Sequence, residues 1–369
     1  MIQSRKAYLD VMKFLAIVLV VLGHCMQKYI NNYTNTILYN FVWLFQMPAF
    51  FFISGYLHIK EEKVTTAKDM WKYIFKRFKA YFIPIVTFVI LNTLINSNYS
   101  SFKDLILTIV NKFLQWPFNI HVSLWFLFVL MLYSIYSIFV THLISKQKSQ
   151  VKKILIAGAL VFLFEIIFAS LIYFVNGEFL GAKLVIYYSI YFLLGYIVEI
   201  FENGSLILKL SSKFNVKLIT FIFSSIISLF ICIFVKGIAN FSDTNILQLI
   251  IRVFGSMVTV ISVYLLLKML FNNKSNLFLS KLGQYTLEIY YIHIILNKLI
   301  VFAHASPNYY ESTFNQWGIA LLTFIIILTC SYIINFVIQY IPYLHYIIFG
   351  TKENKLSLFN RKEVEQCKN

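Results

Sequence analysis

The sequence predicts an all-α, polytopic integral membrane protein, a helical bundle with about ten transmembrane helices. Hydrophobic residues make up 60% of the 369 residues and charged residues only 13%, against roughly 25% charged residues in soluble domains. Apolar runs long enough to cross a bilayer recur along the chain. The net charge of +17 could suit nucleic acid, but the basic residues cluster between apolar runs. We therefore expect contact with membrane lipid and none with nucleic acid.

Ten apolar runs are candidates for spans across a hydrocarbon core of ~30 Å. The predicted spans are 9–27, 37–57, 80–96, 123–144, 154–175, 182–201, 217–237, 246–270, 283–303 and 316–338. The third span is short and is interrupted by Pro84 and Asn92. The stretch 104–118 is apolar but ends in Trp116 and Pro117, so we predict an interfacial or re-entrant segment there.

The loops between the spans alternate in charge. Residues 58–79 and 145–153 and the tail 350–369 are rich in lysine and arginine, whereas 28–36 and 176–181 hold little positive charge. By the positive-inside rule the basic loops are cytoplasmic, and both termini with them. An even number of spans agrees with that orientation, which suits a multi-pass membrane protein.

The domain organisation is simple, because no internal repeat or low-complexity block interrupts the apolar runs. We predict one transmembrane domain over 1–349 and a short cytoplasmic tail over 350–369. No small-residue cleavage site follows the first run, so we expect it to stay in the protein as a span. Paired spacing is absent among the four cysteines, Cys25, Cys232, Cys330 and Cys367. Neither a disulfide framework nor a metal site is expected.

The first span carries three ionisable residues in line. Eleven helical steps lead from Lys13 to His24, which brings the two side chains to within roughly 20° of one another and about 16 Å apart along the axis. Asp10 lies on nearly the same face, one turn before Lys13. Such groups usually face a protein interior or a wet cavity. The alternative is that Asp10 and Lys13 anchor the helix at the interface and His24 is a hydrogen-bonded core residue.

The second span ends in a run that combines a proline, small residues and a serine. Pro48 removes a helix hydrogen bond inside the membrane, which is tolerated where neighbours or water satisfy the freed carbonyl. Gly55 allows close helix approach, and Ser54 can hydrogen-bond across helices. A packing motif explains these residues as well as a binding site does.

Basic and aromatic residues precede two further spans. Lys72, Lys76, Arg77 and Lys79 either anchor the third span or bind a polyanion such as a coenzyme phosphate, where arginine supplies a bidentate fork. Trp125, at the start of the fourth span, is ordinarily an interface anchor.

The ninth predicted span places Thr286, Tyr290 and His293 at positions i, i+4 and i+7, hence on one face. Glu288 points elsewhere. His293 lies roughly 15 Å beyond Gly283 along the helix, near the middle of the membrane. A lone histidine at that depth is either a hydrogen-bonded core residue or part of a site.

Taken together, these segments resemble the acyltransferase-3 family of bacterial membrane acyltransferases, and in the opening and the second-span motif its fucose 4-O-acetylase-like subgroup. The resemblance covers most of the chain through LDVMKFLAIVLVVLGH, FQMPAFFFISGYL, KRFKAYFIP, SLWFL, YFLLGY and LGQYTLEIYYIH. The family pattern pairs a basic residue with a histidine that follows it after ten intervening residues, here Lys13 and His24, although many members have arginine at the first position. This chain also departs from the pattern at Gln46, where histidine is frequent, and at Ala80, where a second arginine often stands.

The resemblance implies an O-acyltransferase that moves an acyl group, most simply acetyl, from cytosolic acetyl-CoA to a hydroxyl of a cell-surface or lipid-linked saccharide. The acceptor would be of capsule, exopolysaccharide or O-antigen type. Acetyl-CoA would be a substrate, and we expect no permanently bound cofactor. His24, Lys13 and Asp10 are the catalytic candidates, with His24 as general base.

The remaining site residues divide between donor binding and the cavity wall. We expect Arg77, Lys79, Lys76 and Ser54 on the donor side, and Trp125, Tyr290 and His293 in the wall. Two other functions stay open on the residues alone. A transporter of a saccharide or its lipid-linked precursor would also use broken spans and intramembrane charges, and a membrane scaffold of a polysaccharide assembly complex is the third reading.

Overall fold

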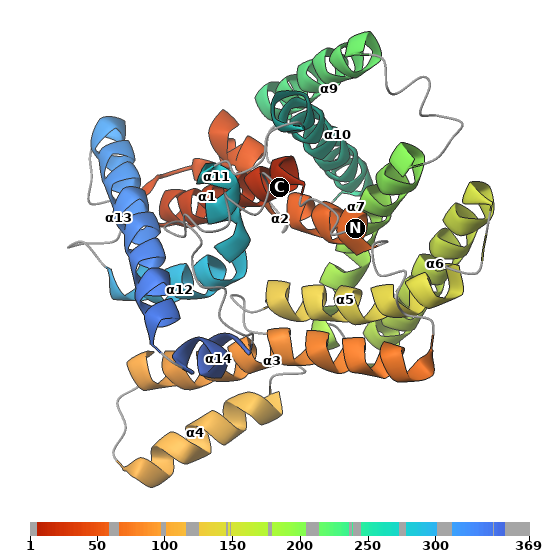
Figure 1. Cartoon of the computed structure of the whole chain (residues 1–369). Coiled ribbons are helices and arrows are strands. Elements are labelled where there is room, and N and C mark those ends of the chain that lie inside the picture. Colours follow the sequence, from red (N-terminus) through yellow and green to blue (C-terminus); the bar gives the residue numbers. More distant parts are fainter. Residues whose placement is uncertain are drawn as a thin grey trace, which may run out of the picture.

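The computed structural model describes the chain as a bundle of helices (Figure 1). The described residues are 6–58, 66–96, 101–115, 125–144, 147, 149–175, 179–203, 214–235, 238, 245–272, 278–300, 312–341 and 343–350. Within them all regular secondary structure is helical, which confirms the predicted fold class. The tail 351–369 lies outside the described residues.

The long helices are α1 (Ala7–Tyr29), α2 (Ile37–His58), α3 (Ala67–Asn96), α4 (Phe102–Gln115), α5 (Trp125–Ile144), α6 (Gln150–Val175), α7 (Ala182–Asn203), α9 (Phe214–Phe234), α10 (Ile246–Phe271), α12 (Thr286–Leu299) and α13 (Thr313–Tyr340). The short elements are η1 (Tyr33–Asn35), η2 (Phe179–Gly181), α11 (Phe278–Leu282), η3 (Gly283–Tyr285) and α14 (Leu344–Phe349).

Nine of the described helices are long and apolar enough to cross a membrane. They match nine of the ten predicted spans, and the chain is a multi-pass membrane protein. The remaining prediction, 283–303, is not one continuous helix. Its described part covers η3 and α12, with α11 directly before it and a 3-10 turn at Gly283–Tyr285 between the two helices, and residues 301–303 lie outside the description. The 14 residues of α12 span only about 21 Å, so the whole composite element is needed to approach the bilayer thickness.

The third predicted span also differs from its helix. We predicted 80–96, but α3 begins at Ala67 and includes the basic run ahead of the apolar one. Pro84 lies inside this helix without ending it. Thr87 Oγ1 donates to the carbonyls of Ile83 and Pro84, each at 3.1 Å.

Helix α2 lies at the centre of the bundle and packs against α1, α5, α7, α9 and α10. Its crossing with α7 depends on two glycines. A Cβ at Gly55 would lie 1.9 Å from the carbonyl oxygen of Phe192, and a Cβ at Gly195 would lie 1.9 Å from that of Phe52. The predicted close approach at Gly55 is therefore confirmed, and it brings two backbones together as small residues do between membrane helices.

The outer helices turn apolar side chains away from the protein. Phe162 and Phe174 on α6, Phe223 on α9 and Ile325 on α13 are each more than half exposed. Lipid is the environment that suits such side chains, because in water they would form large exposed apolar patches. In Figure 1, α6 and α13 flank the bundle on opposite sides of α1 and α2.

One end of the bundle is held by a charged cluster. Glu202 of α7 accepts from Tyr56 of α2 at 2.6 Å, and its other oxygen pairs with Lys268 of α10 at 2.5 Å. Lys6, just before α1, donates to Tyr56 at 2.5 Å. We call this end, which includes Lys6 and Lys268, the basic end.

The opposite end is defined by the other termini of the same helices. Lys28 of α1 donates to the carbonyl of Asn297 in α12 at 2.7 Å. Asn40 of α2 donates to the carbonyl of Cys232 in α9 at 3.0 Å. Helices α1 and α12 therefore run in the same direction, with the second half of each at this opposite end, whereas α2 begins here and runs antiparallel to α9.

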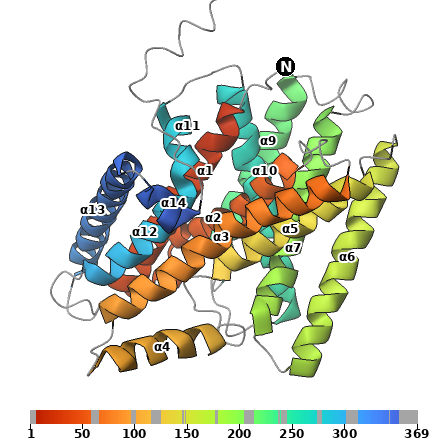
Figure 2. The same ribbon diagram turned by 60° about the horizontal axis from the view of Figure 1, so that its bottom comes forward.

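Helix α3 crosses in front of the upright helices at a slant, and α4 lies along the lower edge of the bundle (Figure 2). None of the residues of α4 is fully buried, and it is not among the helices that could span a membrane. The predicted segment 104–118 corresponds in its described part to α4, and its interfacial or re-entrant position stays a prediction; residues 116–118 lie outside the description.

Candidate active site

A cavity of about 220 Å³ opens at the basic end between α1, α2, α3, α5 and the start of α12. Its polar lining consists of Lys13, Ser54, Arg77, Tyr81, Ser134, Ser137 and Thr286. Three of the residues singled out in the sequence, Lys13, Ser54 and Arg77, thus come from three different helices to one cavity. Two cationic side chains and several hydroxyl groups make this a site for an anionic or polar ligand.

Lys13 is held in place by Asp10. Its Nζ lies 3.0 Å from Asp10 Oδ1, one turn earlier on α1. Asp10 is 3% exposed, and its backbone packs against the 3-10 turn, because a Cβ at Gly283 would lie 1.8 Å from the Asp10 carbonyl oxygen. The predicted line of Asp10 and Lys13 on one face is present. Its physical role is to fix an ammonium group at the cavity wall.

The basic run of α3 contributes one side chain to the cavity. Arg77 lines it, whereas Lys76 and Lys79 do not. The Lys79 ammonium lies 4.4 Å from the ring centroid of Phe75, one turn earlier, and Lys76 is exposed. The helical phase explains the division, since neighbours in a helix point about 100° apart.

His24 does not line this cavity but contacts His293. Their ring centroids are 5.5 Å apart with an interplanar angle of 27°. His293 is 1% exposed and His24 is partly exposed. Both lie in the half of the bundle nearer the opposite end, since α1 ends five residues after His24 and α12 six residues after His293. The shared helix face of Lys13 and His24 therefore does not bring both side chains to this cavity, since Lys13 lines it and His24 faces His293 of α12.

The hydrogen bonds of the two imidazoles indicate their tautomers. His24 Nδ1 lies 3.0 Å from Gln27 Oε1, and the Gln27 amide nitrogen donates to the Tyr39 hydroxyl at 2.5 Å. With the amide so oriented, His24 Nδ1 carries the proton. His293 Nδ1 lies 3.0 Å from the carbonyl oxygen of Ile289, which can only accept. In the neutral form, both rings therefore present an unprotonated Nε2, as a general base requires.

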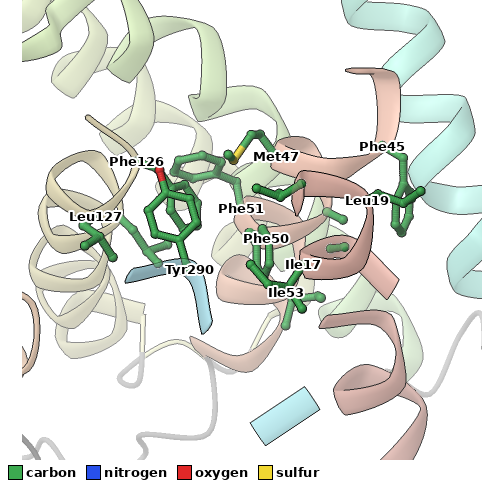
Figure 3. Close-up of a cluster of buried hydrophobic side chains, with 14 of the residues drawn as sticks. Ile17, Leu19, Phe45, Met47, Phe50, Phe51, Ile53, Phe126, Leu127 and Tyr290 are labelled. Carbon is green, nitrogen blue, oxygen red and sulfur yellow. The ribbon is translucent and has the colours of Figure 1, made fainter. Parts of the chain in front are cut away.

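Aromatic rings connect the cavity wall to the histidines and form an aromatic layer between them, and Figure 3 shows three of these rings, Phe50, Phe126 and Tyr290, in the buried cluster. Phe50 and Phe126 belong to the cavity wall, with ring centroids 5.2 Å apart. Phe126 contacts Tyr290 at 4.9 Å, and Tyr290 contacts His293 at 5.5 Å. Thr286, Tyr290 and His293 thus share one face of α12, as predicted, and that face leads from the cavity to the histidine pair.

Trp125 and Ser54 make contacts that serve the packing and the local structure of their helices. Trp125 stacks on Tyr188 with centroids 5.2 Å apart and does not reach the cavity. Ser54 Oγ donates to the carbonyl of Phe50 at 2.8 Å within its own helix. Glu288 points away from the site, as expected, toward His345 at 3.5 Å.

Two residues of interest escaped the sequence reasoning. Gln27, three residues after His24, could have been found from the i, i+3 spacing that brings side chains together on a helix. Arg252 is 0% exposed within α10 and lies near Tyr187, Tyr188 and Tyr191 of α7. An arginine inside an apolar span is a signal of function in its own right.

One of three comparisons with known proteins finds a match, and that match agrees with the architecture. Neither a curated protein nor a solved structure matches the chain. A family model described as an acyltransferase domain, acyltransferase 3, matches residues 6–336, from the start of α1 to near the end of α13. The match includes every element that builds the cavity and the histidine pair, and the chain belongs to this family of acyltransferases.

Proposed function

We propose that this membrane acyltransferase moves an acyl group, most simply acetyl, from cytosolic acyl-CoA to a hydroxyl of a cell-surface or lipid-linked saccharide. The observation that carries the proposal is the arrangement of two unlike sites in one bundle. A cationic cavity opens at the basic end, and a pair of histidines in contact lies toward the opposite end. A donor and an acceptor can enter from the two sides of a membrane.

The cavity suits the donor. Coenzyme A carries phosphates, which Arg77 can bind through its planar fork and Lys13 through its ammonium group. The volume of about 220 Å³ is below the ~300–1,000 Å³ typical of pockets that enclose a whole small ligand. The cavity therefore accommodates part of the donor, and the nucleotide stays at its mouth beside the exposed Arg77.

The histidine pair suits proton transfer. In the proposed reaction His24 Nε2 removes the proton from the acceptor hydroxyl as its oxygen attacks the thioester carbonyl carbon. A C–O bond forms, the C–S bond of the tetrahedral intermediate breaks, and the proton on His24 passes to the leaving thiolate. Gln27 keeps the His24 ring in the required tautomer. Lys13 belongs to the donor side, since it lies about 16 Å from His24 along α1.

The aromatic layer gives the proposal a structural requirement. For the thioester to reach His24, the rings of Phe50, Phe126 and Tyr290 have to move aside. Side chains that separate two compartments in this way keep water and ions from crossing while the site is empty. Closure over a bound donor would also exclude water, which competes with the acceptor hydroxyl.

The proposed location is a bacterial cytoplasmic membrane with the basic end and both termini in the cytoplasm. The motif in α2 and the opening of α1 support a place near the fucose 4-O-acetylase-like subgroup of the family. Capsule, exopolysaccharide or O-antigen saccharides are the proposed acceptors, because a hydroxyl-bearing substrate has to arrive at the opposite end.

The test is acyl transfer by the purified protein in liposomes with radiolabelled acetyl-CoA and the host's saccharide. His24→Ala should lower the rate at saturating donor by ~10²–10⁴ with donor binding nearly unchanged. His142→Gln, on α5 outside the site, serves as a control for folding. NMR of the surface polysaccharide with and without the gene should show loss of an O-acyl signal. Saccharide export without acyl transfer would contradict the proposal, and transfer by His24→Ala at the normal rate would exclude the assigned base.

A further inference from the structure

A second cationic site lies at the opposite end, where α3, α4 and α12 meet. Lys112 of α4 donates to Thr93 Oγ1 at 3.1 Å, and Lys298 of α12 donates to Asn92 Oδ1 at 2.6 Å. Asn92 and Thr93 are neighbours on α3 and are 6% and 0% exposed. Lys112 is partly exposed and Lys298 exposed. The two ammonium groups are close enough to repel one another.

The three helices bring no carboxylate to this corner. Each contains one acidic residue: Asp69 in α3, Asp104 in α4 and Glu288 in α12. Asp104 lies eight residues before Lys112, about 12 Å along the helix, and Glu288 lies ten residues before Lys298, about 15 Å. Among the residues that the structure describes, neither lysine has a carboxylate within ion-pair distance.

The helix dipoles explain why each lysine lies at the end of its helix, but they do not explain why the two lysines lie close together. Lys112 and Lys298 lie in the last turns of α4 and α12, where a positive charge is favoured by the helix dipole. The dipoles do not require both side chains to converge on adjacent residues of a third helix. Two like charges held together are stabilised when an anion binds between them.

The surface beside the two lysines is apolar. Leu94 and Ile95, which follow Thr93 on α3, and Leu299, which follows Lys298 on α12, are between 41% and 56% exposed, and α4 lies at the edge of the bundle in Figure 2. An anion site bordered by such a surface fits a phosphate attached to a hydrocarbon chain. A free, water-soluble anion would gain nothing from the apolar residues.

We propose that Lys112 and Lys298 bind the phosphate of a lipid-linked saccharide, which is then the acceptor of this enzyme. The inference rests on the proposed function and narrows its substrate class. Lys298 follows His293 by five residues on α12, about 7.5 Å along the axis. A phosphate held at Lys298 therefore places the attached sugar at the end of the bundle where His24 and His293 lie.

The same phosphate chemistry could come from a bulk phospholipid, so the experiment compares both sources. The full-length protein is placed in phosphatidylcholine nanodiscs, and binding of farnesyl diphosphate, a short lipid diphosphate, is measured with farnesol as the uncharged control. A second set of discs contains phosphatidylglycerol as competitor. The variant is Lys112→Gln with Lys298→Gln, in which the amides can still donate to Thr93 and Asn92. Lys103→Gln, an exposed lysine of α4, is the matched control.

We expect the double variant to raise the Kd for farnesyl diphosphate by about tenfold or more, since a charge-assisted contact is worth roughly that much. Lys103→Gln should bind like the wild type, farnesol should bind more weakly, and phosphatidylglycerol should leave most of the diphosphate bound. Equal binding by the double variant would overturn the proposal. Full displacement by phosphatidylglycerol would assign the site to bulk phospholipid and overturn the acceptor role.

The binding measurement uses no acyl donor and can be repeated in His24→Ala protein. Its outcome is therefore separate from that of acyl transfer. If transfer fails while diphosphate binding depends on the two lysines, the reaction assignment is wrong and the anion site stands. If transfer to a lipid-linked saccharide proceeds at the normal KM in the double variant, the anion site is wrong and the reaction assignment stands.

Discussion

The rings of His24 and His293 lie with their centroids 5.5 Å apart, although one belongs to α1 and the other to α12. Each uses Nδ1 for a local hydrogen bond, to Gln27 and to the carbonyl of Ile289. The shared result is two imidazoles in the same tautomer on facing helices. A base and a second ring that limits its motion form a better-defined site than a single histidine in a flexible environment.

Gln27 should control the orientation of His24. Gln27→Met removes the acceptor for Nδ1 and should lower kcat for acyl transfer by about tenfold or more, with the donor KM unchanged. Gln27→Glu keeps an acceptor at the same position and should restore most of kcat. The measurement is initial rates in liposomes at varied donor. A glutamate variant as slow as the methionine variant would indicate that Gln27 acts only through packing.

Nine of the predicted spans and their order could be predicted from the sequence because apolar run length decides them. Two boundaries could not be predicted. The basic start of α3 is helical but not apolar, so hydropathy placed its beginning 13 residues late, at 80 instead of Ala67. The break at Gly283 depends on close packing against the backbone of Asp10, and no local pattern reveals that contact.

The positions of the site residues could be predicted from the sequence where the helical phase alone decides which side chains share a face. Lys13 with Asp10, and Thr286 with Tyr290 and His293, were placed by periodicity alone. The separation of Lys13 from His24 by an aromatic layer was not, because Phe126 comes from α5 and its position is a property of the assembled bundle.

The α2–α7 crossing should be the most sensitive packing contact to small substitutions. Gly55→Ala places a Cβ 1.9 Å from the Phe192 carbonyl oxygen, and the backbones have to separate. Overpacking of this kind costs about 1–3 kcal/mol, so the apparent Tm in detergent should fall by several degrees. Gly158→Ala on α6, where a Cβ meets nothing within 4 Å, is the matched control. An equal Tm for both variants would contradict the close crossing.

The orientation of the bundle can be tested by cysteine labelling in intact cells. A thiol reagent that does not cross membranes should leave Cys367 in the tail unlabelled, because the positive-inside rule places the tail in the cytoplasm. Asn35→Cys, at an exposed position of η1, should be labelled from outside in the same cells. Labelling of Cys367 before the cells are opened would reverse the proposed topology.

Arg77 should act on donor binding and not on the chemical step. Arg77→Ala removes a guanidinium from the cavity wall, and the loss of a charge-assisted phosphate contact should raise the KM for acetyl-CoA by about tenfold. The rate at saturating donor should change little, since a contact made equally in the ground and transition states does not alter kcat. Arg77→Lys keeps the charge without the bidentate fork, and its KM should fall between those of the wild type and Arg77→Ala.

Lys68→Ala, near the start of the same helix and outside the cavity, controls for the general loss of positive charge. Titration with coenzyme A alone then separates binding from turnover. An unchanged affinity in Arg77→Ala, together with a lower kcat, would place Arg77 at the reacting carbonyl and move the chemical step into the cavity at the basic end.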